Sequence, residues 1–192
     1  MKQQLMVAFR VTLVMTILTG LIYPGVVTVI GQALFHDKAN GSLVTVNGKV
    51  IGSDLIGQKF AKPEYFQPRP SAAGDGYDAT ASGGSNLGPT SKKLADRIND
   101  AAAAFRKDNP DYSGPIPADL LTASGSGLDP HISPANADAQ AARVAKARGV
   151  SLAEIQSLIG STTEAPDLGL LGEPRVNVLR LNIALDTKLP KH

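Results

Sequence analysis

The feature that most constrains this chain is a long uncharged stretch near its N-terminus. No residue from Val11 to Phe35 carries a charge, and most of the residues in this range are apolar. As an α-helix the stretch would be about 37 Å long, which exceeds the roughly 30 Å of a bilayer's hydrocarbon core. We therefore expect a membrane-spanning helix over residues 11–35, after a short segment at 1–10 and before a domain at 36–192.

A cleaved signal peptide is the competing interpretation of this stretch. Lys2 and Arg10 form a positive flank, and Gly31-Gln32-Ala33 has the small-x-small spacing of a cleavage site. The apolar run, however, is well beyond the 7–15 residues typical of a signal peptide. Its length favours an uncleaved anchor.

The charges on either side of the stretch predict its orientation. Lys2 and Arg10 precede it with no acidic residue between them, whereas acidic and basic residues are mixed after it. Positively charged flanks stay in the cytoplasm. We expect the N-terminus in the cytoplasm and residues 36–192 on the other side of the membrane as an exported domain.

Small residues and a proline interrupt the apolar stretch. Gly20, Pro24 and Gly25 would weaken a helix in water. In lipid such residues are tolerated when a neighbouring helix covers the freed backbone, and glycines let two helices approach closely. Two interpretations stay open: a helix that packs on a partner through Gly20 and Gly25, and a lone anchor kinked at the proline.

The exported part begins with a hairpin signal. Asn47-Gly48 separates two apolar runs, Leu43–Val46 and Lys49–Ile51. This dipeptide tolerates the two positive φ angles of a type I′ turn, so the sequence predicts a β-hairpin.

Helices are predicted in the second half of the exported part. Apolar residues recur at helical spacing from Leu94 to Phe105, before Asn109-Pro110. Ser133-Pro134 opens a second helix that stops at Gly149, and Ser151 with Glu154 opens a third that ends near residue 160. An apolar element at 176–185 fits either a strand or a helix, and its composition favours the helix. The predicted class is α+β, with strands mainly near the start of the domain.

Two long stretches without a predicted regular element complete the domain. Pro68–Thr90 and Ser113–Ser133 are rich in glycine, proline and serine. Loops of this length are uncommon in compact domains and are usually functional or disordered. We expect a loop-rich domain in which these two segments form an interaction surface.

Composition excludes several classes of function. The chain has 19 Lys and Arg against 17 Asp and Glu, and the excess is Lys2 and Arg10, so the exported part is neutral. Nucleic-acid binding needs clustered positive charge. The absence of cysteine excludes disulfides, zinc ribbons and thiol nucleophiles.

No self-contained active site is legible in the sequence. His36, His131 and His192 have no His or Cys partner at metal-ligand spacing, and neither a P-loop nor a dinucleotide-binding glycine pattern occurs. A membrane-tethered hydrolase using Ser126 or His131 remains an alternative, but no nucleophile-and-base pattern supports it. The residues favour a protein that acts by contacting a membrane partner.

Six sequence strings, in order and spread over the whole chain, resemble one bacterial family. The chain resembles the C subunit of the Kdp potassium-transporting P-type ATPases. The strings are Phe35–Leu43, Gly52–Phe60, Tyr65–Ala72, Ser82–Pro89, Ser124–Pro134 and Gly172–Leu179.

The resemblance implies an accessory, non-catalytic subunit of an ATP-driven high-affinity potassium uptake pump in the bacterial inner membrane. Its implied partners are a channel-like potassium-binding subunit and a P-type subunit that hydrolyses ATP, and its implied role is assembly and activity. Family accounts describe a catalytic chaperone that raises the ATP affinity of the hydrolysing subunit. They propose a glycine-serine motif as the nucleotide contact, which corresponds here to Ser82, Gly83, Gly84, Ser85 and Asn86.

The predicted topology conflicts with that nucleotide contact. ATP is cytoplasmic, whereas the flanking charges predict that Ser82 lies outside. We give the flanking charges more weight than a short motif, and expect the domain to lie over the outer mouth of the channel-like subunit. Ionic contacts from Arg69 and Asp129 would then fix its register on that partner.

Overall fold

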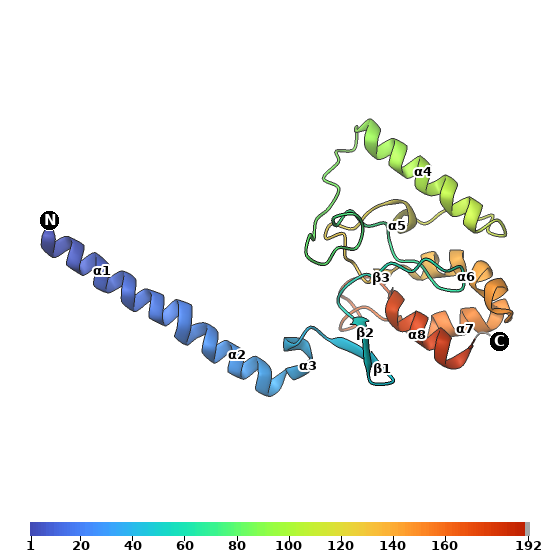
Figure 1. The fold of residues 1–192 in the computed structure, drawn as a ribbon. Helices are drawn as coiled ribbons and strands as arrows, with labels where there is room; N and C mark the ends of the chain where they lie inside the picture. The colour runs from blue at the N-terminus through green and yellow to red at the C-terminus, as the bar shows by residue number, and fades with distance from the viewer. Residues whose placement is uncertain (191–192) are drawn as a thin grey trace. The chain divides into compact units, whose positions relative to one another are not determined.

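The computed structural model describes residues 1–190 (Figure 1). The chain forms two compact units. The first unit is Met1–Ser53 and the second begins at Asp54. The hairpin therefore groups with the N-terminal helix. His192, one of the three histidines considered above, lies outside the described residues.

A single long helix dominates the first unit. It consists of α1 (Lys2–Ile17), a π-helical turn η1 (Leu18–Ile22) and α2 (Tyr23–Leu34). The 33-residue run has a mean hydropathy of 2.1 in its most apolar window, and none of that window is buried within the structure. The helix is thus long and apolar enough to cross a membrane, and it begins nine residues before the predicted span.

The π-helical turn has a local cause in the sequence. Pro24 has no backbone N–H, so it cannot donate to the carbonyl one turn earlier. The N–H of Tyr23 donates to the carbonyl of Leu18, which gives the wider π spacing just before the proline. The backbone absorbs the proline within a continuous helix.

The predicted hairpin is confirmed. After a short helix α3 (His36–Ala39), strands β1 (Leu43–Val46) and β2 (Lys49–Ser53) pair antiparallel. The turn residues Asn47 and Gly48 have φ angles of 50° and 76°, as a type I′ turn requires.

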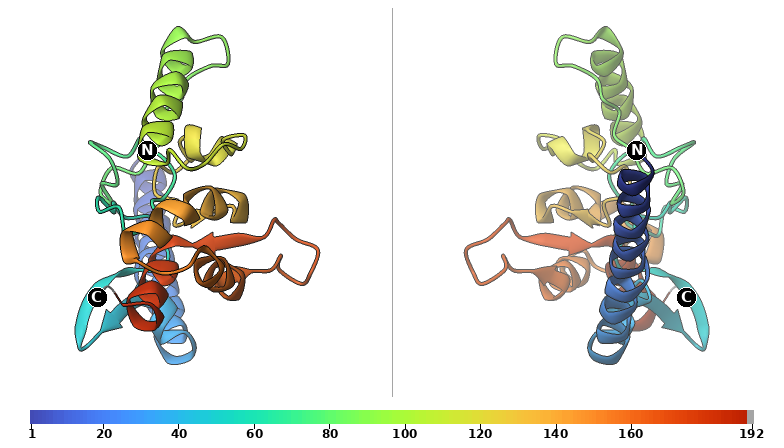
Figure 2. Two further views of the ribbon diagram at one scale, coloured as in Figure 1. Left: turned by 90° about the vertical axis from the view of Figure 1, so that its right-hand side faces the viewer. Right: turned by 90° about the vertical axis from the view of Figure 1, so that its left-hand side faces the viewer.

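The core of the second unit lies between three helices and a small sheet. The helices are α6 (Pro134–Arg148), α7 (Leu152–Thr162) and α8 (Val178–Lys188). Strands β3 (His131–Ile132), β5 (Arg175–Asn177) and β4 (Thr163–Glu164) pair antiparallel in that order. Figure 2 shows the three helices gathered on this sheet. The largest fully buried apolar side chains are Phe66, Ile132, Val144, Ile155, Val176, Val178, Leu181 and Leu185.

The helix boundaries predicted from capping residues are confirmed. The Ser133 hydroxyl accepts a hydrogen bond from the Asn136 N–H at the start of α6, and Gly149 ends that helix with a φ of 71°. Ser151 and Glu154 form a complete capping box at the start of α7, which ends two residues later than predicted.

Two predictions about the second unit need correction. Strands β1 and β2 lie near the start of residues 36–192 as predicted, but three further strands, β3, β4 and β5, all lie after residue 130. The element predicted at 176–185 is a strand as far as Asn177 and a helix from Val178. The helix that the composition favours is confirmed for residues 178–185.

The predicted irregular segments are confirmed only in part. Pro68–Thr90 contains no helix or strand within the described chain, whereas Ser113–Ser133 contains the short helix α5 (Ala118–Leu121) and β3. The predicted helix between them is α4 (Lys92–Asp108), which ends at Asn109 as expected. The observed fold is a mixture of helix and sheet, in agreement with the α+β prediction, and it carries one apolar N-terminal helix.

Candidate functional site

An irregular segment at residues 62–67, which we call the strap, crosses the core of the second unit. Phe66 at its end is completely buried. The Phe66 N–H donates to Asn182 Oδ1 at 2.9 Å, and Asn182 Nδ2 donates to the Phe66 carbonyl at 3.0 Å. Gln140 makes the same pair of bonds with Gln67, at 2.9 and 3.0 Å. Two side-chain amides thus satisfy a stretch of backbone that has no neighbouring strand.

Two arginines from α6 hold the other end of the strap. Arg148 is almost fully buried; it donates to the carbonyls of Glu64 and Leu189 and pairs with Asp186 at 2.7 Å. Its guanidinium also lies 5.1 Å from the centre of the Tyr65 ring. These bonds compensate for burying the charge and fix the path of the chain that leads to the loops.

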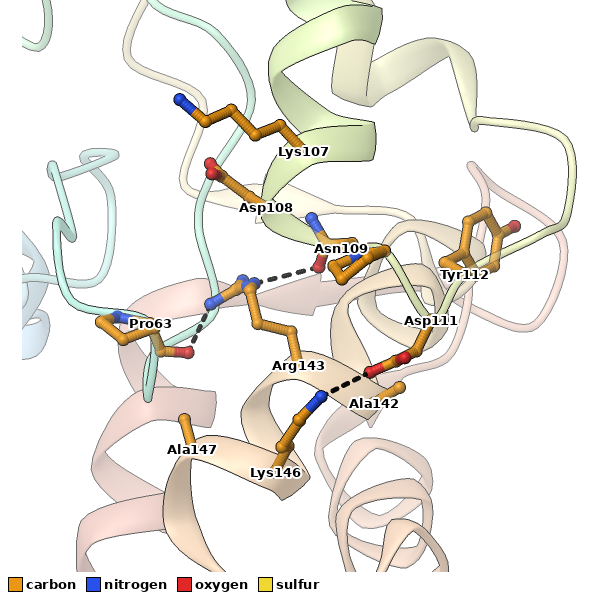
Figure 3. A pocket seen from close by; sticks show the side chains of 11 residues that line it. Pro63, Lys107, Asp108, Asn109, Asp111, Tyr112, Ala142, Arg143, Lys146 and Ala147 are labelled. Carbon is orange, nitrogen blue, oxygen red and sulfur yellow. Dashed lines mark hydrogen bonds and ion pairs between the residues drawn. The ribbon is translucent and has the colours of Figure 1, made fainter.

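Arg143 lies in a cavity of about 300 Å³ between the end of α4 and α6 (Figure 3). It donates to the carbonyl of Pro63 and to Asn109 Oδ1. Burial lowers the pKa of the Arg143 guanidinium, but an arginine stays charged at any physiological pH. Figure 3 also shows the ion pair of Lys146 with Asp111 at the rim. The side chains that line this cavity also form the contacts between the end of α4, helix α6 and the strap.

The five residues of the predicted nucleotide contact lie in a loop that packs on the second loop. The Gly83 N–H and the Ser82 hydroxyl both donate to the Ser126 carbonyl, at 2.8 and 3.0 Å. A Cβ on Gly84 would lie 2.9 Å from the Gly125 carbonyl oxygen, so a larger residue would push the loops apart. Ser85 is half-buried and Asn86 is exposed with a φ of 50°.

The glycines of the second loop serve the same close approach. A Cβ on Gly127 would lie 2.6 Å from the Gly83 carbonyl oxygen, and the φ of Gly127 is 68°. The Ser71 hydroxyl donates to the Gly127 carbonyl at 2.6 Å. Both glycine-serine stretches therefore have a structural role in joining residues 71–84 to residues 124–128.

Arg69 and Asp129, the two predicted interface residues of the domain, form an ion pair with each other. Arg69 Nη1 lies 3.0 Å from Asp129 Oδ2, and the two side chains are 25% and 29% exposed. The hydroxyl of the half-buried Tyr77 donates to the Arg69 carbonyl at 2.7 Å, and partial burial raises the pKa of Tyr77 to about 12. Burial alone would raise the pKa of Asp129, but hydrogen bonds from His131 and Arg69 bring it below its ordinary value.

The ion pair is one end of a longer set of ionisable side chains, which we call the charged row. His131 Nδ1 lies 3.5 Å from Asp129 Oδ1, and its Nε2 lies 4.0 Å from Glu164 Oε2. Arg175 pairs with Glu164 at 3.1 Å and with Asp167 at 3.4 Å. The charged row is Arg69, Asp129, His131, Glu164, Arg175 and Asp167.

The charged row borders an open cavity of about 470 Å³ beside the three-stranded sheet. Side chains of both signs reach it, including Asp119, Glu173 and Arg175. Such a surface can form ionic and hydrogen-bonded contacts with another protein. Sequence reasoning missed Glu164 and Arg175, because their pairing follows from the register of β4 on β5, where they lie opposite each other.

The helix glycines lie where a partner could approach. A Cβ on Gly25 would meet no atom within 4 Å, and one on Gly20 would meet only the Thr16 methyl group at 3.9 Å. Both are exposed within the first unit. The prediction that this face packs on another helix remains a prediction.

The residues of the alternative hydrolase have structural contacts of their own. The Ser126 hydroxyl accepts a hydrogen bond from the Leu128 N–H at 3.1 Å. His131 belongs to the charged row, and His36 lies beside Asn40 after the apolar helix. Within residues 1–190, no group of three or more His, Cys, Asp or Glu side chains could hold a metal ion.

Comparison with known proteins places this chain in a family. A family profile described as KdpC, K+-transporting ATPase, c chain, matches residues 5–187. A potassium-transporting ATPase KdpC subunit of Koribacter versatilis is 51% identical over 191 residues, covering 99% of this chain and 97% of the relative.

Two further relatives carry the same name. The KdpC subunit of Nitratidesulfovibrio vulgaris is 57% identical over 182 residues, covering 92% of each chain. That of Mycobacterium tuberculosis is 53% identical over 187 residues, covering 97% of this chain and 99% of the relative. The resemblance drawn from the six strings is confirmed: the chain belongs to the KdpC family of potassium-transporting ATPase subunits.

Proposed function

We propose that this chain is an accessory subunit of an ATP-driven, high-affinity potassium uptake pump and catalyses no reaction itself. The observation that carries the proposal is the likeness over nearly the whole chain to proteins named as KdpC subunits of potassium-transporting ATPases. The contacts within the second unit agree with it. The glycine-serine loops, the strap arginines and the buried amides all make structural contacts, and the charged row is an open polar surface.

The proposed location is the bacterial inner membrane, with the N-terminus in the cytoplasm and the second unit outside. The support is the unburied apolar helix Lys2–Leu34 and the positive flank formed by Lys2 and Arg10. The helix stays attached as an anchor and packs through Gly20 and Gly25 on a helix of a partner subunit.

The proposed partners are a channel-like potassium-binding subunit and a P-type subunit that hydrolyses ATP. The second unit docks over the outer mouth of the channel-like subunit. Arg69 and Asp129 contribute to this contact as a preformed ion pair, which presents both charges in a fixed geometry. A fixed pair loses less side-chain entropy on docking than two free side chains would.

The loop Ser82–Asn86 has a structural role in this proposal. Its groups already bond to Ser126, and the proposed topology separates it from cytoplasmic ATP. A nucleotide contact by this loop is the opposing outcome. Ser82→Ala removes one loop contact, and under this proposal it leaves the ATP affinity of the assembled pump unchanged. A rise in the ATP dissociation constant of that variant would support the nucleotide contact instead.

Co-purification tests the accessory role. A tag on the full chain, extracted in a mild detergent, should bring along both transport subunits in fixed proportion. The purified chain alone should turn over neither ATP nor model esters. Turnover by the chain alone that is lost in Ser126→Ala or His131→Ala would replace this proposal with an exported hydrolase.

A further inference from the structure

The loop between β4 and β5 carries an unusual concentration of exposed apolar side chains. Leu168 is 91% exposed, Leu170 is 87% exposed and Leu171 is 61% exposed. Only two other large apolar residues of residues 54–190 are exposed, and they lie elsewhere in the sequence, at Leu55 and Leu152. We call residues 166–172 the leucine tip. Figure 2 shows this loop projecting away from the sheet and the helices.

Backbone hydrogen bonds hold the leucine tip in a defined turn. Asp167 and Leu171 exchange both backbone hydrogen bonds at 2.9 Å, and the Gly169 N–H donates to the Pro166 carbonyl at 2.9 Å. The Asp167 carboxylate also pairs with Arg175, which ties the tip to β5. Leu168 has a φ of 54°, a conformation that costs a branched side chain free energy. The bulky apolar side chains are therefore exposed to solvent on a hydrogen-bonded turn whose backbone is strained at Leu168.

We propose that the leucine tip inserts into an apolar pocket on the outer surface of a transport subunit of the same complex. This inference rests on the proposed function. The tip continues directly into the charged row, because Asp167 belongs to both and pairs with Arg175 of the row. An apolar centre beside a polar rim is the usual anatomy of a protein interface, where a few buried anchors supply most of the affinity.

The chemistry of the loop favours a protein over a lipid surface. Segments that lie in a membrane interface combine apolar residues with Lys, Arg and aromatic side chains. Residues 165–174 contain none of these, and the leucines are flanked by Asp167 and Glu173. Insertion into the headgroup region would bring Asp167 and Glu173 with the leucines, and the neighbouring Arg175 is already paired with Asp167 and Glu164.

A double variant of the full chain tests the affinity. Leu168→Asn with Leu170→Ser removes two apolar anchors, and asparagine adopts a positive φ more readily than leucine. Since burying a leucine is worth about tenfold or more in affinity, the dissociation constant for the remaining subunits should rise about a hundredfold. The thermal midpoint of the free chain should not fall, because both side chains are exposed and asparagine tolerates the positive φ of residue 168. Leu152→Ser, at an exposed leucine on α7, should change the dissociation constant by less than about twofold.

A cross-linking experiment identifies what covers the tip and does not depend on that variant. The chain has no cysteine, so Leu170→Cys carries a photoreactive label at one position only. In the purified complex within lipid nanodiscs, the label should cross-link to a transport subunit. Cross-linking to lipid alone, or an unchanged dissociation constant for the double variant, would overturn the inference. If the unaltered chain does not co-purify with the transport subunits, the proposed function itself fails, so the two failures are distinguishable.

Discussion

Replacing Asn182 with alanine should destabilise the second unit far more than the loss of a few side-chain atoms suggests. The Asn182 side chain is 2% exposed, and its amide makes both hydrogen bonds to the backbone of Phe66, at 2.9 and 3.0 Å. Alanine removes both partners and leaves a buried N–H and a buried carbonyl without a bond. Phe66 is completely buried, so water cannot replace the lost amide without entering the core.

The magnitude follows from those two groups. Each buried polar group left unpaired costs about 1–3 kcal/mol, so the pair costs about 2–6 kcal/mol before any relaxation of the strap. A domain has a free energy of unfolding of about 5–15 kcal/mol, which makes this a large fraction of the total. Urea unfolding of the full chain in mild detergent, followed by circular dichroism, measures the change. Hydrogen exchange at the Phe66 amide reports whether the strap has opened.

Thr187 provides a matched control on the same helix. It is exposed on α8 and its hydroxyl bonds only to the Ile183 carbonyl within its own helix. Thr187→Ala should change the free energy of unfolding by no more than about 0.5 kcal/mol. If Asn182→Ala is equally mild, or if the Phe66 amide stays protected from exchange, the strap does not depend on the side-chain amide and the reasoning is wrong.

Four further predictions concern topology, helix packing, the ion pair and the pH dependence of stability. Protease added to intact spheroplasts should digest the second unit, and the purified protein should retain its original N-terminus; full protection would place the domain inside. Gly20→Leu or Gly25→Leu should reduce co-purification with the transport subunits without affecting membrane insertion, whereas the neighbouring Val26→Leu should have no effect. Arg69→Glu should weaken assembly of the pump more than it lowers the thermal midpoint of the free chain, and equal effects would argue for a purely structural ion pair. Because folding lowers the pKa of Asp129, its carboxylate stabilises the fold above about pH 4, and this contribution is lost as the pH falls through the folded-state pKa. Asp129→Asn should therefore make the free energy of unfolding depend less on pH in that range.

The elements that sequence predicted well are those with local causes. Asn47-Gly48 determines its turn through its own φ angles, and Ser133, Gly149 and the Ser151 capping box determine helix ends through bonds to residues three or four positions away. None of these requires knowledge of the rest of the fold. The apolar helix was legible for the same reason, since its composition alone meets the requirements of a bilayer.

The elements that sequence missed depend on distant partners. Strands β3 and β4 are two residues long, too short for an alternating pattern, and they exist because both pair with β5. Gln140 and Asn182 look like ordinary surface residues of a helix until the strap is placed against them. Sequence analysis identified Arg69 and Asp129 as separate interface residues. It could not predict their ion pair, because they are 60 residues apart in the chain and no local pattern indicates that they meet.

Reconstitution of the pump with and without this chain tests the accessory role most directly. Proteoliposomes containing both transport subunits would be assayed for potassium uptake and for potassium-dependent ATP hydrolysis at low potassium concentration. The account predicts that both activities require the full chain, while the chain alone hydrolyses no ATP. Undiminished uptake and hydrolysis without the chain, or ATP hydrolysis by the purified chain alone, would contradict it.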